Sequence, residues 1–270
     1  MSALTDGLRR LLSEPALNNV DPDSPEFTLA HRRILETKPL TRAVFTDFYR
    51  RCCSADERYF GASRSHARVE LGSGAGFMKE VAPDVYTSDV KFLPFVDLVA
   101  RGEELPFADS SLRAVYAINV LHHVSDPRSL FRELTRVLAP GGGVVMIEPY
   151  YGPVARFLFQ RLFTSEAYEP HAREWSEHGR DQPASGANQA LSYVILRRDR
   201  ARWEREFPQL ELVLDQPHTH LSYVASGGVN FRQLVPNGMV NAVSRLERLL
   251  APIDRWLALQ HTLVVRRRTA

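Results

Sequence analysis

The chain has 270 residues, a formal net charge of +2 and 24% charged residues. This length accommodates one large domain or a domain with a lid, and so small a net charge supplies no strong field to gather nucleic acid or another large polyanion. The two cysteines, Cys52 and Cys53, are neighbours, a pattern of reduced thiols and not of a disulfide framework. No stretch approaches about 18 uninterrupted apolar residues, so we expect a cytoplasmic protein without a transmembrane segment.

Residues 1–66 are predicted to be helical. Leu4, Leu8, Leu11 and Leu12 follow the spacing of one helix face up to Pro15. Residues 27–49 carry a second helical pattern, which Pro39 interrupts.

Residues 68–78, RVELGSGAGFM, combine a β-type run, a glycine-rich turn and the start of a helix. This arrangement directs backbone N–H groups at a bound ligand, and glycine lets the ligand lie against the backbone. The dinucleotide fingerprint G-x-G-x-x-G is not met, because Phe77 stands where its third glycine belongs. A P-loop is excluded because no Gly-Lys-Ser/Thr follows.

Further strands and helices alternate downstream of this turn. Residues 85–90 form a short β-type run that ends in an acid, and residues 113–119 form a buried strand that leads into His122 and His123. An amphipathic helix over 128–138 precedes a strand at 144–147, which ends in Glu148. Ligands of an open parallel sheet bind at the carboxyl ends of its strands, so these strand ends face the expected site.

The last third of the chain leaves this alternating pattern. Residues 153–163 predict an amphipathic helix, 166–181 are rich in titratable groups, and 185–195 are first polar and then strand-like. A charged helix is expected at 199–207, and strands are expected at 210–214 and 261–266.

Four motifs in order resemble those of the class I S-adenosylmethionine (SAM)-dependent methyltransferases: ELGSGAG at 70–76, LPF at 105–107, NVLHHV at 119–124 and RVLAPGG at 136–142. The resemblance implies an α/β fold with a Rossmann-like, mostly parallel sheet and an antiparallel terminal strand. Motifs outside the core, among them HRRIL at 31–35, EPYY at 148–151 and ANQALSYVI at 187–195, are similar to those of an uncharacterised group of bacterial and archaeal methyltransferases. The resemblance implies an association of some members with surface-glycan or lipid biosynthesis.

The resemblance also implies a division of the chain. We expect an N-terminal helical extension at 1–66, a SAM-binding core at 67–151, a lid or substrate region at 152–206, and the sixth and seventh strands at 207–270 with a helical insertion at 218–259. The N-terminal helices lie over the SAM pocket or cover one sheet edge. The helix at 153–163 is a lid, a surface for an apolar substrate or a membrane, or a helix packed on the domain. The insertion is a substrate-side cap or a part of the core.

SAM binding is expected to use the strand ends. In the family, the glycines face the methionine half of SAM, the preceding acid helps to hold the ligand's ammonium group, and an acid after the second strand accepts hydrogen bonds from the ribose hydroxyls. Arg101 stands where the family has its adenine-binding acid, so either Glu103 is the acceptor or Arg101 stacks on the adenine. The expected cofactor-binding residues are Glu70, Gly72, Ser73, Gly74, Gly76, Asp89, Val90, Gly102, Glu103, Asn119 and Val120.

The implied reaction is an in-line displacement that moves a methyl group from SAM to a small-molecule, lipid or glycan-precursor acceptor and leaves S-adenosylhomocysteine (SAH). A base is needed only when the acceptor must lose a proton. The candidate bases are His123, Glu148 and His171, and the residues expected to shape the acceptor pocket are Tyr150, Tyr151 and His122.

Other functions remain open at this point. A SAM- or SAH-binding sensor or scaffold without catalysis is compatible with Arg101, and an NAD-dependent oxidoreductase is disfavoured by Phe77. No metal site is expected, because adjacent histidines at a strand end point in different directions. Asn119 is not followed by Pro-Pro-Tyr/Phe, which disfavours methylation of planar nitrogens, and no nucleic-acid-binding platform is present. Peripheral contact with a membrane is compatible with the sequence.

Overall fold

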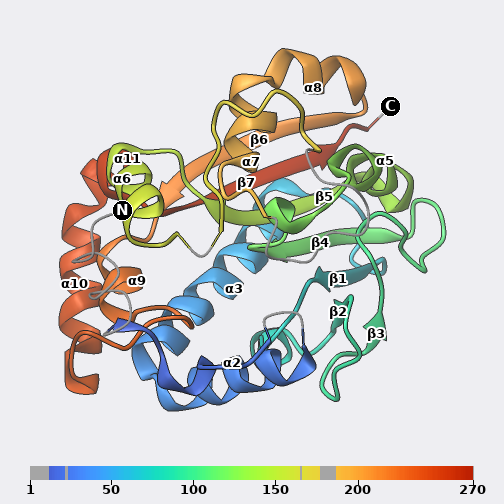
Figure 1. Cartoon of the computed structure of the whole chain (residues 1–270). Helices are drawn as coiled ribbons and strands as arrows, with labels where there is room; N and C mark the ends of the chain where they lie inside the picture. Colours follow the sequence, from blue (N-terminus) through green and yellow to red (C-terminus); the bar gives the residue numbers. More distant parts are fainter. Residues whose placement is uncertain (1–11, 22–23, 165, 177–186, 270) are drawn as a thin grey trace.

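The computed structural model describes residues 12–21, 24–164, 166–176 and 187–269. Its centre is a seven-stranded sheet in the order β3-β2-β1-β4-β5-β7-β6 (Figure 1). The strands are β1 (Ala67–Leu71), β2 (Val85–Asp89), β3 (Leu98–Val99), β4 (Leu112–Ile118), β5 (Leu138–Pro149), β6 (Leu210–His218) and β7 (Gln260–Arg267). The first five strands pair in parallel, and β7 runs antiparallel to both β5 and β6. The predicted fold class, including the reversed terminal strand, is confirmed.

Two layers of helices cover the sheet. One face packs against α3 (Pro39–Tyr59) and α4 (Met78–Val81), and the other packs against α5 (Pro127–Val137), α7 (Leu191–Tyr193) with the π-helix Val194–Arg198, and α8 (Arg200–Glu206). Strand side chains alternate between these two cores. In β5, Val144 and Met146 face the α5 side, whereas Val145 and Ile147 face the α3 side.

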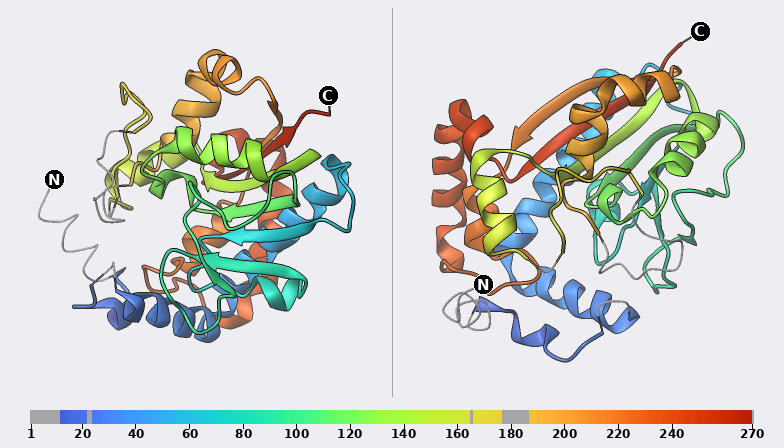
Figure 2. Two further views of the ribbon diagram at one scale, coloured as in Figure 1. Left: turned by 90° about the vertical axis from the view of Figure 1, so that its right-hand side faces the viewer. Right: turned by 45° about the horizontal axis from the view of Figure 1, so that its top comes forward.

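The remaining helices lie outside these two layers. They are the 3₁₀ turns Pro15–Leu17, Leu121–His123, Asn237–Met239 and Ala251–Ile253, and the α-helices α2 (Pro25–Thr37), α6 (Pro153–Arg161), α9 (Leu221–Ser226), α10 (Val240–Leu250) and α11 (Asp254–Leu257). Helix α6 follows β5, and α9 to α11 connect β6 to β7, so all four lie at the sheet edge where the parallel strands end (Figures 1 and 2). No described helix is long and apolar enough to span a bilayer.

Two local predictions differ from the structure. The run before residue 195, which the sequence suggests is a strand, is helical in the structure. Leu191, Val194 and Ile195 are all buried, so the segment has no polar face whose spacing would distinguish a helix from a strand. The helix after the glycine turn, α4, is a single turn that ends at Val81, with Ala82 as its C-cap immediately before Pro83. The helix predicted around Leu4 to Leu11 lies outside the described residues.

A buried ionic network anchors α3 to the sheet. The Asp56 carboxylate accepts hydrogen bonds from Arg113 Nε at 2.7 Å and from the Tyr116 hydroxyl at 2.9 Å. Arg113 also donates to the carbonyl groups of Phe60 and Ala62, where the chain leaves α3. Both charges are buried and paired, so this network sets the position of α3 relative to β4.

Candidate functional site

The glycine turn and Asp89 lie together where β1 and β2 end. Gly72 and Gly74 have positive φ angles of 60° and 48°. Ser73 N donates to the Ser88 carbonyl at 2.8 Å, and Gly74 N donates to Asp89 Oδ2 at 2.8 Å. The structure therefore places the glycine turn, which is expected to bind the methionine half of SAM, beside Asp89, which is expected to bind its ribose.

The three glycines of the turn have different surroundings. A Cβ atom on Gly72 would lie 2.7 Å from Val120 Cγ2, and one on Gly76 would lie 2.3 Å from the Tyr49 hydroxyl. A Cβ on Gly74 would meet only the Gly72 carbonyl, at 3.8 Å. Gly72 and Gly76 are thus required by packing, whereas the space beside Gly74 is open to a ligand.

Glu70 is the buried acid of this turn. Its Oε2 atom is buried and has no hydrogen-bond partner among the described residues, and burial raises its pKa to about 7. An unpaired buried carboxylate oxygen is unfavourable unless a donor or a cation reaches it. The ammonium group of SAM is such a partner, so the residues of the turn fit this cofactor.

The expected adenine side lies beyond Asp89, whose carbonyl accepts a hydrogen bond from Ala100 N at 3.0 Å. Gly102 packs closely, since a Cβ there would lie 3.0 Å from Leu130 Cδ1. Glu103 accepts a hydrogen bond from Ser125 Oγ at 3.3 Å. Arg101 and Val90 are exposed.

The carboxyl end of β4 is held by Glu148. Asn119 has a positive φ of 55°, and the next two backbone N–H groups, of Val120 and Leu121, donate to Glu148 Oε1 at 2.9 and 2.8 Å. The other oxygen, Oε2, lies 2.5 Å from His122 Nδ1. Glu148 is fully buried, and both of its oxygens hold the β4 end, so its geometry suits an anchor better than an exposed base.

A cluster of His122, His123 and Glu166 lies on this anchor. His122 Nε2 is 3.5 Å from Glu166 Oε2, and His123 Nε2 is 3.8 Å from Glu166 Oε1. Burial lowers the pKa of His122, but Glu148 and Glu166 together outweigh burial and raise it to about 10. Burial raises the pKa of Glu166, but the hydrogen bond and charge of His122 lower it below its usual value. The two carboxylates therefore favour the protonated form of His122.

Glu166 is the member of this cluster that the sequence did not single out. The segment from residue 166 was recognised only as rich in titratable groups. In the structure it is tied back to the molecule because Gln189 N donates to the Ala167 carbonyl at 2.9 Å and Asn188 N donates to the His122 carbonyl at 3.1 Å. Glu166 and the two histidines are more than forty positions apart along the chain, so no local sequence pattern predicts their contact.

The same cluster has the donor types of a metal site. Ligand atoms of His122, His123 and Glu166 all lie within 4.8 Å of one another, and imidazole with carboxylate suits zinc and related ions. The argument from diverging side chains is therefore wrong, because both Nε2 atoms approach one carboxylate. The expected absence of a metal stays a prediction.

The residues expected around the acceptor separate into two groups. Tyr151 stacks on Tyr193 with ring centroids 3.7 Å apart, in an aromatic cluster with Tyr168. Tyr150 is instead buried beside His261, at a centroid distance of 5.5 Å. His171 is exposed in the turn after Pro170 and takes no part in the contacts of Glu166 given above.

Helix α9 adds one side chain near the cluster. Tyr223 is half-buried, and desolvation together with the Glu166 carboxylate raises the pKa of its hydroxyl to about 12. The insertion leaves β6 at His218 and enters β7 at Gln260, which pairs with Pro149 at the end of β5, so it lies at the edge of the sheet where the parallel strands end.

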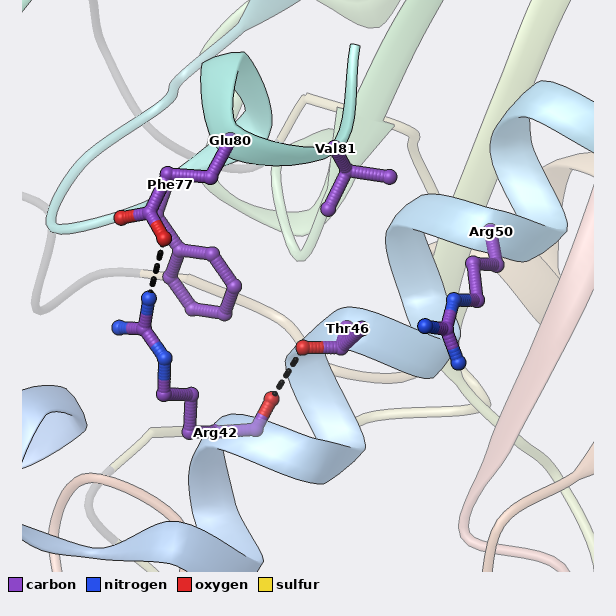
Figure 3. Close-up of a pocket in the computed structure, with 6 residues that line it drawn as sticks. All are labelled: Arg42, Thr46, Arg50, Phe77, Glu80 and Val81. Atoms are coloured by element: carbon purple, nitrogen blue, oxygen red, sulfur yellow. Dashed lines mark hydrogen bonds and ion pairs between the residues drawn. The ribbon is translucent and has the colours of Figure 1, made fainter.

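A separate pocket of about 410 Å³ lies between α3 and α4 (Figure 3). The Arg42 guanidinium forms an ion pair with Glu80 and lies 4.2 Å from the centroid of the Phe77 ring. The lining, which also includes Thr46, Arg50 and Val81, contains none of the predicted cofactor residues. The pocket lies behind the glycine turn and is distinct from the strand-end site.

Comparison with known proteins points to one activity. Residues 69–146 match the methyltransferase domain family. A protein from Mycolicibacterium gilvum described as an uncharacterized methyltransferase is 25% identical over 239 residues, which cover 86% of this chain and 91% of the relative. The O-methyltransferase rstn1 of Aspergillus nomiae is 36% identical over 69 residues, or 26% of this chain and 31% of that protein.

Solved structures include geranyl diphosphate C-methyltransferase from Streptomyces coelicolor in complex with Mg²⁺, geranyl diphosphate and SAH. It is 16% identical over 99% of both chains, with a TM-score of 0.46. The matched domain spans the glycine turn, Asp89, the β4 end and most of β5, the part of the sheet that carries the candidate site. The chain therefore carries a methyltransferase domain on a seven-stranded sheet whose terminal strand is reversed, an arrangement similar to that of the class I SAM-dependent methyltransferases.

Proposed function

We propose that the protein methylates a hydroxyl group of a small-molecule, lipid or glycan-precursor acceptor, with His123 as the general base. The observation that carries this proposal is the Glu166 carboxylate 3.8 Å from His123 Nε2. A nearby carboxylate stabilises the imidazolium that forms when the base takes a proton. The similarity to a relative named O-methyltransferase supports an oxygen acceptor.

The other candidate bases are less suited. Glu148 is buried and engaged with two backbone N–H groups and His122. His122 lies between Glu148 and Glu166, which raise its pKa, so it already carries a proton near neutral pH. His171 is exposed and is not among the contacts of the cluster. Of the histidines at the β4 end, His123 is the half-exposed one.

Different residues of the chain hold the cofactor, accept the proton and exclude water. Bound SAM supplies an electrophilic methyl group on its sulfonium sulfur. The glycine turn, Glu70 and Asp89 hold and orient it, and His123 accepts the proton of the acceptor hydroxyl as the oxygen bonds to the methyl carbon. The lid segment at Glu166 and the aromatic rings of Tyr151 and Tyr193 exclude water. Orientation of this kind contributes roughly 7–11 kcal/mol in favourable cases.

The test compares His123→Gln and Glu166→Gln with His171→Gln as a matched control. Isotope-labelled SAM is incubated with each variant and with extracts of lipids and polar metabolites, and transferred label is measured by mass spectrometry. We expect a loss of roughly 10²- to 10⁴-fold in turnover for His123→Gln, a smaller loss for Glu166→Gln, and no change for His171→Gln. The affinity for SAH, measured by calorimetry, stays the same in all three.

Two outcomes would contradict the proposal. Full turnover in both His123→Gln and Glu166→Gln would show that the general base is not at this position. Loss of wild-type turnover in EDTA, with recovery after Zn²⁺ or Mn²⁺ is added, would assign the cluster to a metal ion instead, because its donor atoms suit both roles.

A further inference from the structure

The outer side of α10 and α11 carries a continuous apolar stripe. Six exposed apolar side chains between residues 239 and 256 recur at intervals of three and four, the spacing of one helix face, whereas Val243 of the same segment is buried. Leu249 is exposed to 76% and Trp256 to 51%. The stripe consists of Met239, Ala242, Leu246, Leu249, Ile253 and Trp256. Figures 1 and 2 show these helices on the outside of the molecule, with α9 between α10 and α3.

The acidic side chains of the same segment point inward. Residues 239–256 contain two carboxylates, Glu247 and Asp254. Glu247 Oε1 accepts a hydrogen bond from His220 N at 2.6 Å, and Asp254 Oδ1 lies 3.1 Å from His220 Nε2. His220 is buried. Both negative charges are therefore turned toward the body of the protein.

Three arginines flank the apolar stripe. Arg245, Arg248 and Arg255 each precede a stripe residue by one position, so they form a parallel row beside it. All three are exposed, and none lies within ion-pair distance of a carboxylate in the described part of the chain. The Arg255 guanidinium lies 5.2 Å from the centroid of the Trp256 ring. We call the apolar stripe and these three arginines the Arg–Leu surface.

We propose that the Arg–Leu surface binds the interface of an anionic lipid bilayer. Helices that lie in the plane of a membrane surface combine leucine and tryptophan on one side with basic residues beside them. Tryptophan favours the level of the headgroups, and each arginine near an anionic surface contributes about 1 kcal/mol. A second copy of the chain is a poorer partner, because the contact would then hold six guanidinium groups, three from each copy, and no outward-facing carboxylate from this segment.

The proposal goes beyond methyl transfer itself, because it states where the acceptor of the proposed reaction comes from. The insertion that carries the Arg–Leu surface leaves β6 at His218 and enters β7 at Gln260, which pairs with Pro149, the residue after Glu148 of the candidate site. The surface and the site thus belong to the same edge of the sheet. Docking there brings an acceptor with a lipid tail to the site from the bilayer.

The fluorescence of Trp256 provides a direct measurement of binding to lipid vesicles. The chain has three tryptophans, and Trp175 and Trp203 are exposed to only 2% and 0%. A fluorescence change on adding vesicles therefore reports mainly on Trp256. The full chain is titrated with vesicles of phosphatidylcholine, and with vesicles in which about one third is phosphatidylglycerol. We expect a blue shift and co-flotation with the anionic vesicles, both weakened by added salt.

Variants separate the proposal from nonspecific attraction. Arg245→Glu/Arg248→Glu/Arg255→Glu should weaken binding to anionic vesicles at least about a hundredfold. Leu246→Ser/Leu249→Ser should abolish the blue shift. The control Arg58→Glu/Arg64→Glu/Arg205→Glu changes the same charge at exposed positions elsewhere and should retain binding. All substituted side chains are exposed, so folding is preserved and is verified by circular dichroism.

Three results would overturn the proposal: no binding of wild type to anionic vesicles, equal loss in the control variant, or a dimer in light scattering that Leu246→Ser/Leu249→Ser converts to a monomer. The vesicle assay requires no turnover. Failure of membrane binding is therefore distinguishable from failure of the proposed methyl transfer.

Discussion

Among single residues, the three glycines of the turn show how one motif serves two purposes. Gly72 and Gly76 leave room for Val120 and Tyr49, whereas the space beside Gly74 is open. All three were predicted from the sequence, because glycine spacing is a local property of the chain. Which glycine faces a ligand was not, because that depends on β2 and β4 arriving beside the turn.

Gly74→Ala should weaken SAH binding at least tenfold with a small effect on stability. The new methyl group meets no protein atom closer than 3.8 Å and projects into the open space beside Asp89, and the positive φ costs about 1 kcal/mol. Calorimetry gives the affinity and thermal unfolding gives the stability. Gly76→Ala is the matched variant and should mainly lower stability, because its Cβ would lie 2.3 Å from the Tyr49 hydroxyl. Unchanged affinity in Gly74→Ala would place the ligand elsewhere.

Glu70 makes both stability and cofactor binding depend on pH. Burial raises its pKa from 4.5 to about 7, so the folded protein retains a proton that the unfolded chain loses. Below pH 4.5 the group is protonated in both states and has no effect on stability. As the pH rises from 4.5 to about 7, stability falls, by an amount on the order of 3 kcal/mol, because the buried carboxylate ionises without a partner.

Glu70→Gln should remove this loss and be more stable than wild type above pH 7. In wild type, SAH affinity should rise between about pH 6 and pH 7.5, because the ionised carboxylate attracts the ligand's ammonium group. The variant should show weaker and nearly pH-independent binding. Denaturant unfolding and calorimetry at several pH values measure both effects. A wild-type stability that rises with pH across this range while Glu70→Gln stays parallel to it would refute the assignment.

At the level of secondary-structure elements, the main strands and α5 follow their sequence patterns closely. Helix α5 has a Pro at its start and the Asp126 side chain as its N-cap, accepting from Ser129 N at 3.2 Å. The helix from Leu191 was predicted as a strand because its buried residues leave no periodicity. Helix α3 was predicted, but its attachment through Asp56 was not, because Arg113 lies 57 positions away along the chain.

Asp56→Ala should destabilise the protein by about 3–5 kcal/mol, since it leaves the buried Arg113 guanidinium without its carboxylate. Denaturant unfolding measures the change. The matched control is Asp47→Ala on the same helix, which removes an exposed pair with Arg51 and should cost less than about 1 kcal/mol. Equal effects of the two substitutions would show that the network contributes nothing beyond a surface ion pair.

Across the whole molecule, distant segments meet around the strand-end site. Arg32 of α2 donates to the Gly76 carbonyl at 2.7 Å, and Lys38 donates to the Phe231 carbonyl of the insertion at 2.6 Å. Tyr223 of the insertion packs against the hydrophobic cluster that contains Phe159 and Tyr168. The N-terminal helices therefore contact both the glycine turn and the insertion between β6 and β7.

SAH binding should consequently stabilise the whole protein and not the sheet alone. At a hundredfold excess over Kd the gain is about 2.7 kcal/mol, which corresponds to a rise in Tm of roughly 5–10 °C for a chain of this size. Thermal unfolding followed by circular dichroism and by Trp256 fluorescence should give one coincident transition. Asp89→Asn should reduce the shift, since its amide replaces the oxygen that binds Gly74 N. Two separate transitions would show that the insertion unfolds independently.

The sequence by itself determined the fold class, the glycine turn, the acid after β2, the β4 end and the reversed last strand. These features depend on local spacing and on apolar periodicity, which a single chain displays directly. Only the tertiary structure decided that Glu148 anchors the β4 end, that Glu166 joins His122 and His123, and that the acids of α10 and α11 face inward. Those facts arise from contacts between residues far apart in the chain, and side-chain direction across such contacts has no local signature.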